Sequence, residues 1–157
     1  MKPYLYLFLF IFIYSSCSSS ESIEEVELID YDALNETEIQ NYLSLNNLNP
    51  QKSSSGLYYI ITDEGIGNSP TLLSNVKVNF KGYGTNGVIF EESPDEGIDF
   101  NLNDLIIGFS EGVTYLKENG EATLIIPSKI GYPNNLLPPH SLGGKVIIFD
   151  VKLIKIN

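Results

Sequence analysis

The sequence contains no arginine, no tryptophan, one cysteine and one histidine. A single cysteine excludes an internal disulfide, and one Cys with one His cannot supply the side-chain ligands of a structural zinc site. The 20 acidic residues outnumber the nine lysines and give a formal net charge of −11. This balance argues against a nucleic-acid partner, because cationic side chains must neutralise the phosphates. A length of 157 residues allows one domain with appendages, but no separate cofactor-binding domain.

Most of the usual catalytic arrangements of side chains are missing as well. No glycine-rich loop precedes a helix, as a phosphate-binding loop requires. His140, the only imidazole, follows two prolines and has no serine-nucleophile motif to serve. The pair Glu91 and Glu92 is typical of a solvated strand end. By contrast, 10 Tyr and 8 Phe residues favour an aromatic-rich site that recognises an apolar group or supports a reaction without proton transfer.

Residues 1–16 are predicted to be a lipoprotein-type signal peptide. Lys2 precedes the apolar run 4–14, and small residues follow this run directly before Cys17, which is the order of an export signal. The run is too short to cross a bilayer as a helix, which takes roughly 20 residues. The junction resembles the lipobox of bacterial lipoproteins, although Tyr14 stands where that box usually has Leu. Acylation of Cys17 would anchor the protein to a membrane of the bacterial cell envelope, facing the periplasm or the cell surface. An ordinary secretory signal is the alternative.

Residues 17–34 are predicted to form an acidic tether. Between positions 21 and 38 the sequence has eight acidic residues and no basic one. Like charges at this density keep a segment extended and solvated, as a spacer between a lipid and a domain requires. An export or surface-sorting signal is the alternative function of this segment.

Residues 35–50 are predicted to contain a short amphipathic helix. Asn35, with an acid three positions later, is typical of an N-cap with a reciprocal acid. Ile39 and Leu43 then fall on one stripe of the helix. A single helix of this length cannot fold alone, so we expect it to dock on the following domain or on a second copy. We also expect it to be separable from that domain, which should fold and bind ligands without it.

The rest of the chain combines strand patterns with one helical pattern. Phe109 and Val113 have helical spacing, whereas Ile147, Phe149 and Val151 alternate along one face of a strand. The predicted strands lie at 57–62, 76–81, 88–92, 100–102, 122–126 and 146–156. Successive strands with a single helix predict an α+β domain, in which a curled antiparallel sheet wraps around that helix.

Seven short motifs follow one another through this part of the chain. They are VKVNFKG (76–82), NGVIFEES (86–93), FNL (100–102), LIIGFSEGV (105–113), IPSKIGY (126–132), LPPH (137–140) and IFDVKL (148–153). In the same order they are similar to the motifs V-x-V-x-Y-x-G, F-D-S-S, F-x-L, V-I-x-G-W followed by E-G-[VL], I-P-x-x-x-A-Y, I-P-P-x and V-F-D-V-x-L. Residues 56–157 therefore resemble the domain of the FKBP-type peptidyl-prolyl cis-trans isomerases.

The resemblance implies five to six antiparallel strands around one short helix, with a proline pocket between sheet and helix. The floor of that pocket would be Phe109, and its walls would be Phe80, Phe90, Phe100, Leu105, Leu137 and Phe149. The backbone N–H of Ile106 and the hydroxyl of Tyr132 would hold the substrate, and Glu91 stands where the family has a pocket Asp.

The implied activity is isomerisation of X–Pro bonds in proline-containing peptides or unfolded exported proteins, assisting folding in the cell envelope. It needs no metal and no organic cofactor, and macrolide-type compounds would be inhibitors.

Three of these site residues depart from the family pattern. Phe80 replaces the usual Tyr, Glu91 is one methylene longer than Asp, and Phe109 replaces the usual floor Trp. The departures predict reduced isomerase activity. One alternative is a catalytically weak module that binds proline peptides or acts as a chaperone. Another is a structural envelope lipoprotein that uses the acidic helix 35–47 as its contact.

Overall fold

The computed structural model describes residues 29–135 and 140–157. The predicted signal peptide, Cys17, most of the predicted tether and Leu137 lie outside the described residues. The helices are α1 (Tyr31–Asn46) and α2 (Ile107–Thr114), with 3₁₀ turns η1 (Leu102–Asp104) and η2 (Ser128–Ile130). The strands are β1 (Gln51–Lys52), β2 (Tyr58–Asp63), β3 (Asn75–Gly84), β4 (Ile89–Glu92), β5 (Ile98–Asn101), β6 (Glu121–Ile126) and β7 (Ile147–Ile156).

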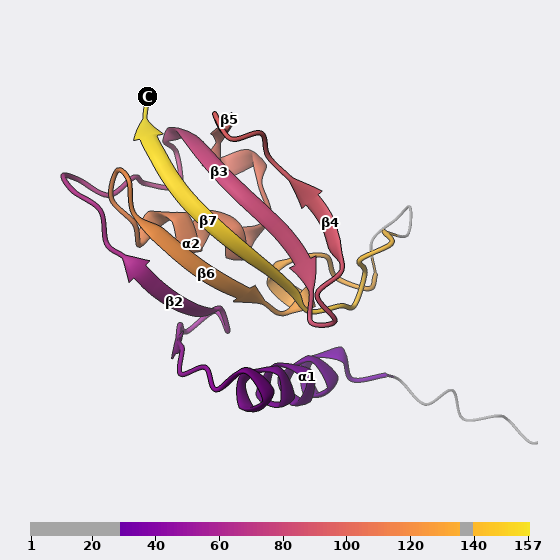
Figure 1. Cartoon of the computed structure of the whole chain (residues 1–157). Helices are drawn as coiled ribbons and strands as arrows, with labels where there is room; N and C mark the ends of the chain where they lie inside the picture. The colour runs from indigo at the N-terminus through magenta and orange to yellow at the C-terminus, as the bar shows by residue number, and fades with distance from the viewer. Residues whose placement is uncertain (1–28, 136–139) are drawn as a thin grey trace, which may run out of the picture.

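The strands form one antiparallel sheet in the order β1-β2-β6-β7-β3-β4, and β5 also pairs with β3. Strands β4 and β5 pair with different parts of β3, so together they occupy one edge position. The sheet is twisted, and α2 lies behind it in the view of Figure 1. The predicted α+β class, an antiparallel sheet around one short helix, is confirmed.

Alternation along the strands places the main core between the sheet and α2. Val76, Val78 and Phe80 of β3 are buried in this core, because successive side chains of a strand point to opposite faces. Gly112 allows α2 to approach the sheet closely, since a Cβ there would lie 2.5 Å from the methyl groups of Leu124 in β6. This close contact fixes α2, and with it the first residues of the helix.

Helix α1 begins earlier than the sequence predicted. Its N-cap is Asp30, whose Oδ1 accepts a hydrogen bond from the Ala33 N–H at 3.1 Å. The prediction of an N-cap at Asn35 is wrong, because Asn35 lies inside the helix and its amide is used in contacts far along the chain. Residues 31–34, assigned to the tether, are therefore helical. The helix ends at Asn47, which adopts a left-handed conformation with φ 53°.

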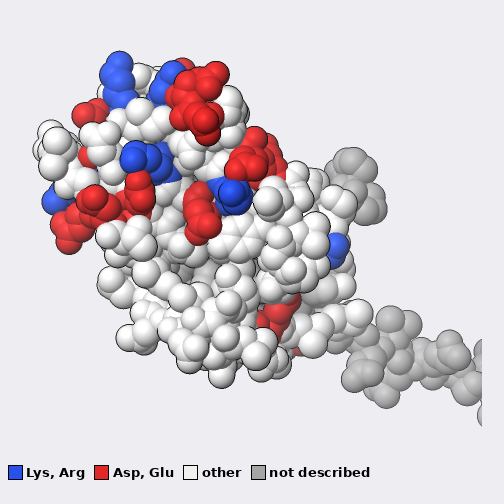
Figure 2. Space-filling view, viewed as in Figure 1, with Lys and Arg blue, Asp and Glu red and all other residues white. Residues whose placement is uncertain are grey.

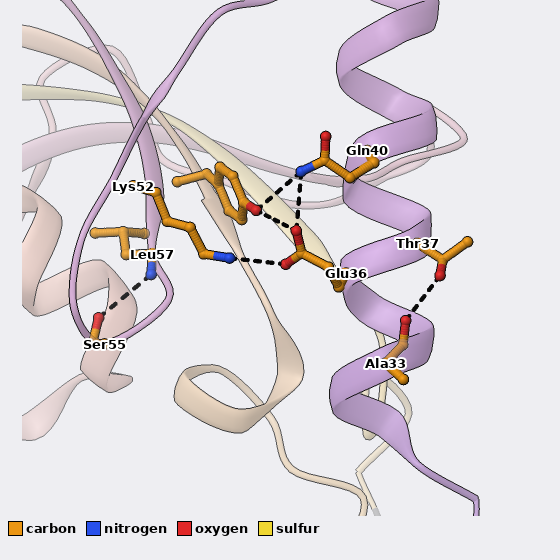
Figure 3. Close-up of polar contacts among 8 residues, drawn as sticks. Ala33, Glu36, Thr37, Gln40, Lys52, Ser55 and Leu57 are labelled. Atoms are coloured by element: carbon orange, nitrogen blue, oxygen red, sulfur yellow. Dashed lines mark hydrogen bonds and ion pairs between the residues drawn. The ribbon is translucent and has the colours of Figure 1, made fainter.

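Helix α1 docks on the outer face of the sheet. Ile39 and Leu43 pack into a second buried cluster with residues of β2, β6 and β7 and of the loop before β7, namely Tyr58, Ile125, Val146 and Ile148. Figure 3 shows Glu36 of α1 directed toward Lys52, with its carboxylate 3.0 Å from Lys52 Nζ, while Gln40 donates to the same carboxylate. The expected docking of the helix on its own domain is thus confirmed. Neither helix of the described chain has the length and apolar character needed to cross a membrane.

Candidate functional site

A pocket of about 310 Å³ opens between the inner face of the sheet and the start of α2. Strands β3, β4, β5 and β7 contribute residues to it. The turn η1 and Tyr132, which lies just after η2, contribute as well. It is lined by Phe80, Glu91, Phe100, Asp104, Leu105, Ile106, Phe109, Tyr132 and Phe149. Eight of these nine residues were predicted from the sequence, and the fold brings those eight together. Asp104 is the ninth.

The floor of the pocket is a cluster of phenylalanine rings. Phe109 is 4% exposed, and its ring meets the ring of Phe149 edge to face, with 5.1 Å between centroids. Phe80 lies 5.9 Å from both of these rings and 6.2 Å from Phe100. Edge-to-face pairs at these distances hold aromatic rings in fixed relative orientations. The pocket therefore presents an apolar, preformed aromatic surface.

Phe90, predicted as a wall, supports the pocket from behind. It does not line the cavity, but its ring packs edge to face on Phe149 with 5.6 Å between centroids. Gly82 makes room for this pair, because a Cβ on Gly82 would lie 2.6 Å from the Phe149 ring and 2.8 Å from the Phe90 ring. Leu137, another of the six predicted walls, lies outside the described residues.

Two hydrogen-bond donors face the aromatic floor. Ile106 is the N-cap residue of α2, and its backbone N–H has no acceptor among the residues described. The Tyr132 hydroxyl likewise has no hydrogen-bond partner within the described part of the chain. Burial raises the pKa of this hydroxyl, and the nearby Glu91 carboxylate raises it further. The hydroxyl consequently stays protonated at neutral pH and can donate to a carbonyl oxygen of a ligand.

Acidic groups stand only at the edge of the site. Glu91 and Asp104 are both solvent-exposed residues that line the pocket. Sequence reasoning missed Asp104, because nothing in its local pattern indicated that the turn η1 carries it to the pocket. Throughout the described ranges, 29–135 and 140–157, no group of three or more His, Cys, Asp or Glu side chains is placed to hold a metal ion.

His140 contacts the site through Tyr132. The two rings are stacked at 4.0 Å with an angle of 5° between their planes. The Leu142 N–H donates to His140 Nδ1 at 3.1 Å, which fixes the orientation of the imidazole. This contact could not be predicted from the sequence, because no local pattern places the rings of Tyr132 and His140 together. His140 therefore belongs to the surroundings of the pocket, although it has no catalytic partner there.

A second hollow, of about 370 Å³, lies on the outer face of the sheet. Its charged side chains form ion pairs with one another, Lys81 with Glu92 at 3.1 Å and Lys152 with Glu121 at 2.7 Å. Figure 2 shows lysines and acids interspersed over the sheet, whereas the region over α1 is mostly uncharged. Exposed pairs of this kind are well solvated and satisfy each other. The aromatic pocket is therefore the better candidate site.

The pocket can bind a small apolar ring that is flanked by carbonyl groups. The ring would lie on Phe109, and the two donors would hold the carbonyls on either side. No charge is buried at the floor of the pocket. The site therefore favours a ligand state with little charge separation over a more polar state of the same ligand.

Comparison with known proteins agrees with this geometry. Residues 67–154 match the family model of the FKBP-type peptidyl-prolyl cis-trans isomerases. A probable FKBP-type peptidyl-prolyl cis-trans isomerase FkpA of Neisseria meningitidis is 40% identical over 107 residues, which are 67% of this chain and 39% of that protein. FkpA of Escherichia coli is 33% identical over 112 residues, with the same two shares. The chain thus spans about two fifths of the length of these curated relatives.

Solved structures give the same picture. The crystal structure of FkpA from Escherichia coli superposes with a TM-score of 0.69 at 29% identity, covering 80% of this chain and 60% of that one. A peptidyl-prolyl cis-trans isomerase from Pseudomonas syringae superposes with a TM-score of 0.67 at 20% identity, covering 83% and 98%. At 20% identity the second comparison concerns the fold alone.

Proposed function

Since this chain belongs to the FKBP-type peptidyl-prolyl cis-trans isomerase family, we propose that it catalyses the cis-trans isomerisation of X–Pro bonds. The observation that carries the proposal is the pocket itself, in which a buried aromatic floor faces two hydrogen-bond donors. Its substrates would be proline-containing segments of exported proteins that are still folding. Macrolide-type compounds that mimic such a segment would compete for the same pocket.

The mechanism follows from the physics of the amide bond. Resonance opposes rotation about a peptide bond with a barrier of about 18–20 kcal/mol. X–Pro bonds populate both isomers, because the tertiary amide narrows the trans preference to roughly 0.5–1 kcal/mol. Twisting the bond removes the resonance and its charge separation, so the transition state is less polar than either planar form. A site that is dry and aromatic binds this twisted form more favourably than the planar ones, as catalysis requires.

Six of the residues that line the pocket have a role in this proposal. The proline ring would lie on Phe109, enclosed by Phe80 and Phe149. The Ile106 N–H and the Tyr132 hydroxyl would donate to the carbonyls beside the rotating bond and keep them from following the rotation. Glu91 would stay at the rim, where its charge does not enter the apolar floor. No step of this scheme requires a general base.

A second candidate is a module that captures proline peptides with little turnover. It is favoured by Phe80 and Glu91, because Phe80 has no hydroxyl and the carboxylate of Glu91, a residue whose backbone pairs with β3, has no hydrogen-bond partner within the described chain. An acid that nothing holds in place leaves one wall of the pocket less organised. Such a site would keep its affinity for the proline ring while losing part of its preference for the twisted form.

NMR exchange spectroscopy on a panel of short X–Pro peptides separates the two candidates. An isomerase accelerates exchange between the cis and trans signals of the peptide at substoichiometric concentration. A binding module shifts and broadens those signals without increasing the exchange rate. Absence of both effects would contradict the proposal as a whole. Phe109→Leu serves as the pocket variant, and Leu45→Ser, on an exposed position of α1, is the matched surface control.

We further propose that the mature protein is acylated at Cys17 and held at a membrane of the cell envelope. This rests on the order of charge, apolar run and small residues before Cys17, and on the acidic stretch after it. Cys17→Ser should release the protein into the soluble fraction and abolish the mass added by the lipid, whereas Ser19→Ala should change neither. A Cys17→Ser protein that stays in the membrane fraction would show that the signal has been misread.

A further inference from the structure

Asn35 of α1 is a buried polar residue that the proposed chemistry does not use. Its side chain is 2% exposed, although it lies on a helix that covers the outer face of the sheet. Its Nδ2 donates to the carbonyl oxygen of Gly144 at 2.9 Å, and its Oδ1 accepts from the N–H of Ser128 at 2.7 Å. One amide group thus ties α1 to two chain segments that lie 93 and 109 positions further along the chain.

These two segments hold Tyr132 in the pocket. Ser128 begins η2, whose C-cap Gly131 is the residue directly before Tyr132. On the other side, the Gly144 N–H donates to the carbonyl oxygen of Tyr132 at 3.0 Å. Gly144 therefore bonds to Tyr132 through its N–H and to Asn35 through its carbonyl oxygen. Helix α1 is thus linked to the backbone of Tyr132 through Gly144 and two hydrogen bonds.

Neighbouring residues of α1 strengthen the same connection. The ring of Tyr31 packs directly on Gly144, which has φ +76° and no side chain to keep the ring away. Asp32 forms an ion pair with Lys129 of η2 at 3.0 Å. The first turn and a half of α1 thus contacts both segments, while its middle is anchored by the Glu36 network of Figure 3.

We propose that Asn35 is a positioning residue for the isomerase site and that α1 is part of the machinery that holds Tyr132. The inference rests on the proposed function, because it assigns the helix a role in that same pocket. Removing the amide leaves a buried N–H and a buried carbonyl without partners, and such groups are costly unless the segments move. Movement of either segment displaces the Tyr132 hydroxyl from the carbonyl it holds. This proposal runs against the expectation that the helix is separable from the pocket, which stays an untested prediction.

A double-mutant cycle in the full-length protein tests this coupling. Asn35→Ala, Tyr132→Phe and the double variant are compared for kcat/KM on one X–Pro peptide. Asn35→Ala should lower kcat/KM by about three- to tenfold in the parent protein, but by less than about twofold in the Tyr132→Phe background. Asn41→Ala, which removes an exposed amide from the same helix, is the matched control and should change neither value.

Two further measurements keep the outcome decisive. If Asn35→Ala does not fold, Asn35→Asp enters the cycle instead: it retains an acceptor for the Ser128 N–H, but it loses the donor to Gly144 and places a carboxylate oxygen against that carbonyl. Aromatic NMR adds a readout independent of turnover: the Tyr132 ring signals, identified by their loss in Tyr132→Phe, should move in the Asn35 variant because the stacking on His140 changes.

Equal losses in both backgrounds would overturn the inference, since they would show that Asn35 acts on the fold as a whole. Unchanged Tyr132 signals together with unchanged kcat/KM would overturn it as well. Failure of the proposed function looks different, because then no variant, including the parent, accelerates exchange. In that case the same cycle is run on the dissociation constant of the peptide, and the NMR criterion is unaffected.

Discussion

Replacing Phe109 by Leu removes the aromatic floor of the pocket while keeping an apolar side chain of similar size. Phe109 makes two edge-to-face pairs, with Phe149 at 5.1 Å and with Phe80 at 5.9 Å. Such a pair contributes about 0.5–1.5 kcal/mol beyond the burial of its area. Because Leu retains most of that burial, we expect the free energy of unfolding to fall by about 1–3 kcal/mol, against about 3–5 for Phe109→Ala.

Replacing Phe109 should reduce activity more than replacing a neighbouring ring of the cluster. Phe109→Leu should lower kcat/KM by roughly tenfold or more, which corresponds to about 1.4 kcal/mol of lost transition-state binding. Phe90→Leu is the matched control. In the parent protein Phe90 makes one edge-to-face pair with Phe149, but it does not line the pocket. It should lose stability by about 0.5–1.5 kcal/mol and change kcat/KM by less than about threefold. Phe109→Trp should raise the affinity for proline-mimicking macrolides.

Urea denaturation followed by tyrosine fluorescence or circular dichroism gives the stabilities, and exchange spectroscopy gives kcat/KM, both on variants shown to be folded. If Phe109→Leu is destabilised as expected but keeps the activity of the parent protein, the aromatic floor does not contribute to catalysis. Equal losses of activity in Phe109→Leu and Phe90→Leu would assign the effect to the general rigidity of the ring cluster. Either result would refute the reasoning.

Three other predictions concern single groups. Tyr132→Phe deletes a hydroxyl that has no partner in the described chain, so stability should change little while kcat/KM falls by about two- to twelvefold, the value of one net hydrogen bond; unchanged kinetics would remove Tyr132 from the site. The hydrogen bond from Tyr58 and the neighbouring Lys52 lower the pKa of Glu36 below its ordinary value of 4.5. The ionised carboxylate therefore stabilises the fold above that pH. This contribution disappears as the pH falls through the lowered pKa. Glu36→Gln should accordingly be less stable than the parent near neutral pH and lose this difference in acid, which urea titrations at both pH values would check; a constant difference would contradict the assignment. Gly82→Ala should cost about 1–3 kcal/mol, because its Cβ would lie 2.6–2.8 Å from two aromatic rings; thermal unfolding no different from that of the parent would contradict this close packing.

The sequence was informative where local pattern and fold agree. Alternation in β3 and β7 and the helical spacing of Phe109 and Val113 predicted the strands and the short helix, since one face of each is buried. The ordered motifs also predicted the site, because the family that they resemble places these residues around one pocket. The residues come from four strands and the start of one helix. Composition alone would have indicated only an aromatic-rich site.

The sequence failed where long-range contacts decide. Asn35 had the appearance of an N-cap, but its amide is used by Gly144, 109 positions away, and the cap falls to Asp30. Asp104 lines the pocket from a 3₁₀ turn, and His140 stacks on the pocket residue Tyr132; neither position has a periodic signal in the sequence. Short-range rules describe which conformation a residue can adopt, while tertiary packing selects the partner.

The most direct test of the account is kcat/KM for X–Pro isomerisation by the full-length protein, measured without a coupling protease between about pH 6 and 8. A pocket that works by binding a less polar, twisted bond needs no titrating base, so the protein should accelerate exchange with a rate that stays within about twofold across this range. A bell-shaped or steep profile that disappears in His140→Ala or Glu91→Gln would contradict the mechanism. Peptide binding with no acceleration at any pH would contradict the proposed enzymatic function itself.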